Sequence, residues 1–129
     1  MTIETYFQQI HETISHCLIV QTSRITYDKR GTYEGFISGD IYFADDSILH
    51  MREFTDVESG VNRLMYRYHY MTDAKTLIFR YDNTGHHRKL NLPTYPHHKH
   101  EGSEENVIPS SAPVLQEVLK EIEWSVMVL

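Results

Sequence analysis

The sequence has 129 residues and is 40% hydrophobic, which is enough for one globular domain with a core of its own. It contains no run of about 18 apolar residues, which excludes a transmembrane helix. Residues 1–4 lack the basic and apolar pattern of a signal peptide, and the single cysteine, Cys17, excludes an intrachain disulfide. We therefore expect one domain over residues 1–129, in the cytoplasm and without membrane contact.

The formal net charge of −6 at pH 7 argues against a broad surface for nucleic acids. The charge is unevenly distributed, however. Residues 80–100 contain four basic side chains and one acidic side chain, a local balance of +3 before any histidine is protonated, so the rest of the chain sums to −9. A small cationic segment on an acidic body suits one or two phosphates better than an extended duplex.

The first predicted element is an amphipathic helix over residues 2–15, for which Thr2 is a suitable N-cap. Its apolar residues recur at three- and four-residue spacings: Ile3, Tyr6, Phe7, Ile10 and Ile14. β-branched residues then favour a strand over residues 18–27. Residues 35–43 and 48–54 have a period of two and are separated by a short acidic turn, which predicts an antiparallel pair.

A β-hairpin over residues 63–82, with its turn at residues 72–76, is the next predicted element. On its first strand, three tyrosines alternate with polar residues: Tyr66, Tyr68 and Tyr70. We expect these tyrosines to belong to the core. The opposite face would carry Arg67, His69, Arg80 and Asp82.

A histidine-rich loop follows the hairpin, and five of the nine histidines fall within residues 86–100. After an acidic loop, Ser110 as N-cap and Pro113 in the first turn predict a second helix that ends near residue 123. The apolar tail, residues 124–129, would add a strand, pack on the core or mediate homo-oligomer or partner contacts. The predicted fold is α+β: a curved antiparallel sheet of about four to six strands with an N-terminal and a C-terminal helix packed on it.

Six short motifs follow one another along the chain: GFISGDIYF at residues 35–43, REF at 52–54, YRYHY at 66–70, FRYDN at 79–83, His86-His87, and PHHKH at 96–100. Over residues 6–122, the chain resembles the TumE family of toxin–antitoxin toxins. This resemblance implies a small prokaryotic toxin whose partner is a helix-turn-helix antitoxin, usually encoded next to it. It does not identify the molecule on which the toxin acts.

The polar residues suit metal-independent cleavage of RNA. This reaction needs a base for the ribose 2′-hydroxyl, an acid for the leaving oxygen and cations beside the phosphate. A histidine with a pKa of about 6.5 serves as base or acid at neutral pH, and the planar fork of arginine matches phosphate oxygens. If the register brings Arg67 and His69 beside Arg80 and Asp82, these groups form a single site.

The candidate site residues follow from this chemistry. The candidate catalytic residues are His69, Asp82, His86, His87, His98 and His100. The candidate substrate-binding residues are Arg52, Arg67, Arg80 and Lys99. A structural interpretation stays open, since the arginines could pair with carboxylates across the sheet and His69 could be a satisfied core residue.

Metal binding is a second chemical interpretation. His98 and His100 would face the same side of an extended segment, and His86 could complete a site for zinc or another transition metal. We nevertheless expect no cofactor, because the histidine spacing matches no standard zinc motif. The sequence also lacks a glycine-rich phosphate loop.

Three classes of function stay open at this point. The favoured one is a toxin that acts on RNA as a metal-independent ribonuclease. The second is a metal-dependent hydrolase or a transferase that modifies nucleic acid, which chelator sensitivity would distinguish from the first. The third is a non-enzymatic module that binds the antitoxin or another protein.

Overall fold

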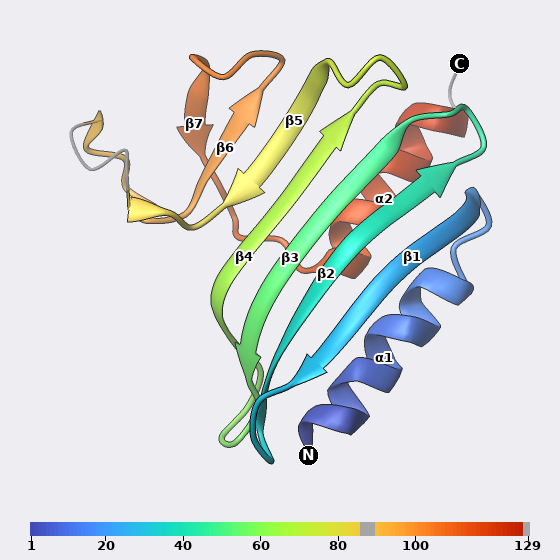
Figure 1. Cartoon of the computed structure of the whole chain (residues 1–129). Helices are drawn as coiled ribbons and strands as arrows, with labels where there is room; N and C mark the ends of the chain where they lie inside the picture. The colour runs from blue at the N-terminus through green and yellow to red at the C-terminus, as the bar shows by residue number, and fades with distance from the viewer. Residues whose placement is uncertain (86–89, 128–129) are drawn as a thin grey trace.

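A seven-stranded antiparallel sheet with a helix before it and a helix after it makes up the described part of the chain, residues 1–85 and 90–127 of a computed structural model (Figure 1). The elements are α1 (Ile3–Ser15), β1 (Val20–Lys29), β2 (Glu34–Phe43), β3 (Ile48–Asp56), β4 (Asn62–Met71), β5 (Leu77–Asp82), β6 (His98–Glu101), β7 (Val107–Pro109) and α2 (Leu115–Met127). The strands neighbour one another in chain order. This arrangement confirms the predicted α+β fold.

Helix α1 forms as its apolar spacing predicts. Its N-cap is Thr2, whose hydroxyl accepts a hydrogen bond from the backbone N–H of Thr5 at 3.4 Å. One stripe of the helix is buried: Ile3, Tyr6, Ile10 and Ile14. The apolar side chains of α1 therefore lie against the sheet, beside β1 and β2 (Figure 1).

The core lies between the helices and one face of the sheet. On β4, alternate residues point into it, and Tyr66, Tyr68 and Tyr70 are no more than 2% exposed, which confirms their predicted place in the core. Helix α2 contributes a second buried stripe: Leu115, Val118, Leu119 and Ile122. Because side chains alternate along a strand, the residues between these tyrosines must lie on the opposite face.

A buried carboxylate connects α1 to the sheet. Glu53 on β3 is 0% exposed, and it accepts hydrogen bonds from the hydroxyls of Tyr6 at 2.6 Å, Tyr68 at 2.7 Å and Thr55 at 2.9 Å. Burial, followed by the charge of Glu53, raises the pKa of both tyrosines, so both remain protonated donors. Glu53 thus faces the core, away from the polar side of the sheet.

The end of the predicted histidine-rich loop is a strand. His98–Glu101 forms β6, which pairs with β5 so that His98 lies opposite Asp82 and His100 opposite Arg80. Strand β7 then covers the outer edge of β6. Both strands are short and lack an alternating apolar pattern, so their formation depends on cross-strand polar contacts that a linear sequence does not display.

Helix α2 begins later and ends later than the sequence predicts. It starts at Leu115 rather than near Ser110 and continues to Met127. The residues just before α2 are not helical. Their carbonyls are bound from outside the segment, because the Arg63 guanidinium donates hydrogen bonds to the carbonyls of Ala112 at 2.7 Å and Pro113 at 2.8 Å. Ala112 also has a positive φ of 55°, which interrupts a helix at that position.

Replacing Glu53 with alanine should lower the free energy of unfolding by roughly 3 kcal/mol or more, because three buried hydroxyls lose their acceptor at once. Chemical denaturation of Glu53→Ala and of the wild type measures this difference. The matched control is Glu58→Ala, since Glu58 is exposed in the β3–β4 connection. A Glu53→Ala variant as stable as the control would contradict a stabilising role for this contact.

Candidate functional site

The sheet face opposite the helices carries two parallel rows of polar side chains. The antiparallel registers align Asp40, His50, His69, Arg80 and His100 in the first row. They align Ser38, Arg52, Arg67, Asp82 and His98 in the second row. We call these ten residues the polar face. The register of β4 and β5 therefore brings Arg67 opposite Asp82 and His69 opposite Arg80, the arrangement that a shared site requires.

The central part of the polar face is accessible to solvent. Arg52 and Arg67 are exposed and lie opposite each other on β3 and β4. The same register places His50 opposite the half-buried His69. Oδ1 of Asp40 lies 2.7 Å from Nδ1 of His50, and this contact fixes the orientation of the His50 imidazole. Two cations and two imidazoles are thus grouped on adjacent strands.

His69 lies in surroundings that disfavour its positive charge. Burial lowers the pKa of His69, and the charges of Arg80 and Arg67 lower it further. Its Nδ1 atom lies 3.5 Å from Nη1 of Arg80. Because the ordinary pKa of histidine is about 6.5, His69 is a neutral imidazole at pH 7 and is able to accept a proton.

Arg80 is buried and is already bound by two carboxylates. It donates to both carboxylate oxygens of Glu104, each at 2.7 Å, and to Asp82 at 3.1 Å. Burial by itself would lower the pKa of Arg80. The bonds to Glu104 and Asp82 outweigh burial and raise the pKa of the guanidinium. Arg80 therefore fixes its neighbours, whereas Arg52 and Arg67 are exposed and accessible to a ligand on this face.

Asp82, His98 and His100 form a buried cluster at the β5–β6 end of the polar face. The Nε2 atom of His98 lies 2.9 Å from Oδ1 of Asp82, and Nε2 of His100 lies 4.0 Å from Oδ2. The three residues are 1–2% exposed. Their possible ligand atoms all lie within 4.8 Å of one another, close enough to surround a metal ion.

Lys99 is directed away from this cluster. Its side chain pairs with Glu101 at 2.6 Å and with Glu121 of α2 at 3.1 Å, and its ammonium lies 4.9 Å from the ring centroid of Tyr81. These contacts connect β6 to α2 on the helix side of the sheet. His86 and His87, also predicted as site residues, lie outside the described residues.

A family model described as Toxin TumE matches residues 7–125 of the 129. The chain belongs to this toxin family. Searches of curated proteins and of solved structures found no match. Membership of a toxin family indicates an antitoxin as partner, and no helix within residues 1–85 and 90–127 is long and apolar enough to cross a membrane.

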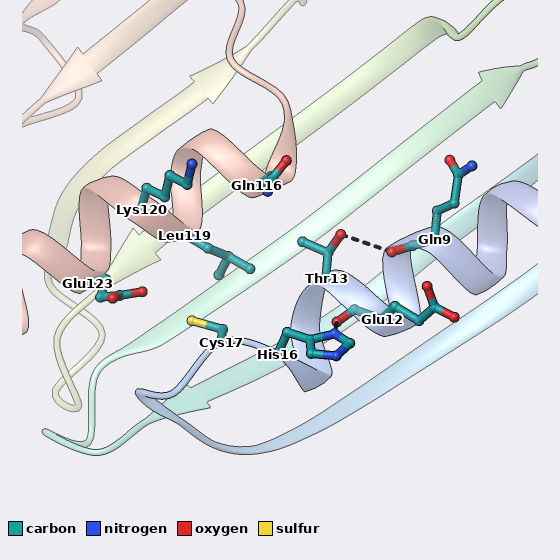
Figure 2. Close-up of a pocket in the computed structure, with 9 residues that line it drawn as sticks. All are labelled: Gln9, Glu12, Thr13, His16, Cys17, Gln116, Leu119, Lys120 and Glu123. Carbon is teal, nitrogen blue, oxygen red and sulfur yellow. Dashed lines mark hydrogen bonds between the residues drawn. The ribbon is translucent and has the colours of Figure 1, made fainter.

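The toxin also has an open groove of about 540 Å³ on the other side of the sheet, between α1 and α2 (Figure 2). Its lining consists of Gln9, Glu12, Thr13, His16, Cys17, Gln116, Leu119, Lys120 and Glu123. Two of these polar side chains bond to the backbone of α1: Thr13 to the carbonyl of Gln9 at 2.9 Å and His16 to that of Glu12 at 2.7 Å. None of the predicted site residues within the described ranges lines this groove, so the candidate site is the polar face.

The candidate residues predicted from the sequence did not include His50, Asp40 or Glu104. Asp40 was detectable, because a short turn between β2 and β3 places it opposite His50. Glu104 was not, because its contact with Arg80 depends on how the β6–β7 connection folds back over β5. The sequence shows only that this connection is acidic.

The surroundings of His69 predict a pKa below the ordinary value of about 6.5, because burial and two nearby guanidinium groups all disfavour imidazolium. An NMR pH titration of the His69 ring measures this pKa. Arg67→Ala should raise it by less than about one pH unit, since Arg67 is exposed and its charge is screened.

The matched control for this titration is Lys120→Ala, which also removes one positive charge but lies in the groove between the helices. It should leave the pKa of His69 unchanged. A His69 pKa at or above about 6.5 in the wild type would contradict this account of the polar face.

Proposed function

We propose that this toxin acts on RNA as a metal-independent ribonuclease whose site is the exposed centre of the polar face. The observation that carries the proposal is the placement of His69, whose pKa is lowered, next to two exposed arginines, Arg52 and Arg67. An imidazole that is neutral at pH 7 and lies beside accessible cations suits proton abstraction next to a phosphodiester.

His69 is the proposed base. It would remove the proton from a ribose 2′-hydroxyl, whose oxygen would attack the adjacent phosphorus while the bond to the 5′-oxygen breaks. The products would be a 2′,3′-cyclic phosphate and a 5′-hydroxyl. Arg67 and Arg52 would hold the phosphate oxygens as negative charge develops on them. No step in this scheme requires a metal ion.

His50 is the proposed acid that protonates the leaving 5′-oxygen. It lies opposite His69 on the neighbouring strand, and the Asp40 carboxylate, 2.7 Å from its Nδ1 atom, orients the imidazole. Asp82, His98 and His100, which were also candidates for proton transfer, are at most 2% exposed. We therefore propose that they act through Arg80 as positioning residues.

The charge distribution favours a short single-stranded segment as substrate. Arg52 and Arg67 could contact one or two phosphates, whereas a chain with a net charge of −6 would repel an extended duplex.

For the protein partner, we propose a helix-turn-helix antitoxin. Trp124 and Met127 of α2, exposed by 73% and 67%, offer apolar surface for that partner or for a second copy of the toxin.

Growth and RNA integrity after induced expression test the proposed activity. The wild type should arrest growth and cleave RNA. His69→Gln should lower the cleavage rate by about 10²-fold or more, because glutamine cannot act as a base. Arg67→Ala should lower it as well, through weaker binding of the phosphate.

The matched control is His11→Gln, which changes an exposed histidine of α1, and thermal unfolding verifies that each variant is folded. Growth arrest with intact RNA would overturn cleavage as the mechanism. Full activity in a folded His69→Gln variant would overturn the role of His69, and a wild type that causes no arrest would overturn the proposal as a whole.

A further inference from the structure

We propose that Asp82, His98 and His100 bind one divalent transition-metal ion, for which Zn²⁺ is the best match. The site lies at the β5–β6 end of the polar face, apart from the exposed arginines that would bind RNA. Two imidazole nitrogens and one carboxylate form a set of ligands typical of zinc and of other first-row metals.

The distances between the ligand atoms suit such an ion. With metal–ligand bonds of about 2.0–2.1 Å, ligands at the corners of a tetrahedron lie roughly 3.3 Å apart. The Nε2 atom of His98 lies 2.9 Å from Oδ1 of Asp82, and that of His100 lies 4.0 Å from Oδ2. Small side-chain movements would thus bring all three atoms into bonding range.

The orientation of the two imidazoles supports the same conclusion. The Nδ1 atom of His98 lies 3.0 Å from the carbonyl of Pro96, and Nδ1 of His100 lies 2.7 Å from that of Glu104. A carbonyl can only accept, so each Nδ1 carries a proton, and the Nε2 atom of each ring, which points to the Asp82 carboxylate, is the atom that would bind the metal in place of a proton. Metal-binding histidines are commonly fixed by such a bond from the second ring nitrogen.

The local charge also favours a cation. The Asp82 carboxylate accepts hydrogen bonds at Oδ1 from the backbone N–H and the hydroxyl of Thr84, each at 3.0 Å, and at Oδ2 from Nε of Arg80 at 3.1 Å. The positive charge of Arg80 is itself offset by Glu104, which it binds through two contacts of 2.7 Å. The formal charges of Asp82, Arg80 and Glu104 sum to −1.

The ion would have a positioning role. Its ligands are 1–2% exposed, so it would lie beneath the surface that RNA contacts. It would join Asp82 on β5 to His98 and His100 on β6, and Asp82 in turn holds Arg80, the neighbour of His69. Metal binding would therefore stabilise the β5–β6 pair and the cationic surroundings of the proposed base.

Metal binding is tested on untagged full-length protein, because a histidine tag would itself bind metal. The protein is stripped with a chelator, dialysed and titrated with Zn²⁺, and elemental analysis gives the number of ions retained. We expect one Zn²⁺ per chain and a higher melting temperature after loading. Co²⁺ in place of Zn²⁺ should give visible absorption bands typical of four-coordinate cobalt.

His98→Ala and His100→Ala should each lose the bound ion and the melting-temperature increase, whereas His11→Ala should keep both. The wild-type titration decides the matter even if a variant does not fold. No uptake of Zn²⁺ or Co²⁺ by the folded wild type would overturn the proposal and leave a hydrogen-bonded His–Asp network. Equal uptake by folded His98→Ala and His100→Ala would overturn the assignment. Neither readout depends on RNA cleavage, so the ribonuclease proposal can fail independently.

Discussion

The antiparallel register of β3 to β6 is the constraint on which the polar face depends. Side chains alternate between the two faces of a strand, so a slip of one residue on β4 would exchange Arg67 and His69 with the buried tyrosines. The burial of the three tyrosines and the hydrogen bonds to the Glu53 carboxylate both require the observed register. The core thus fixes the positions of the polar residues, although none of them belongs to it.

The arginines of the polar face differ in whether carboxylates already pair with them. Arg80 is held by Glu104 and Asp82, whereas Arg52 and Arg67 are exposed. A cation that is already paired would have to give up its carboxylates before it could bind a phosphate, which costs free energy. This contrast makes Arg80 a structural residue that shapes the surroundings of His69, and it makes the exposed pair the better candidates for RNA binding.

Most of the sheet could be predicted because β2 to β5 follow the period of two that a half-buried strand imposes. The short strands β6 and β7 could not, since they pair through polar contacts such as that of His98 with Asp82. The position of Lys99 illustrates the same limit: its charge suggested phosphate binding, but strand alternation directs it towards Glu121 of α2. Glu104 also escaped prediction, because a loop that folds back leaves no periodic pattern.

The most direct test of the polar face as the RNA-binding surface is an NMR titration with a short single-stranded RNA. Methylation of its 2′-hydroxyls allows binding but prevents cleavage through the 2′-oxygen. The account predicts that the largest amide shifts occur on β3 and β4, around Arg52, Arg67 and His69. Shifts confined to the groove between α1 and α2, or no shifts at all, would contradict it.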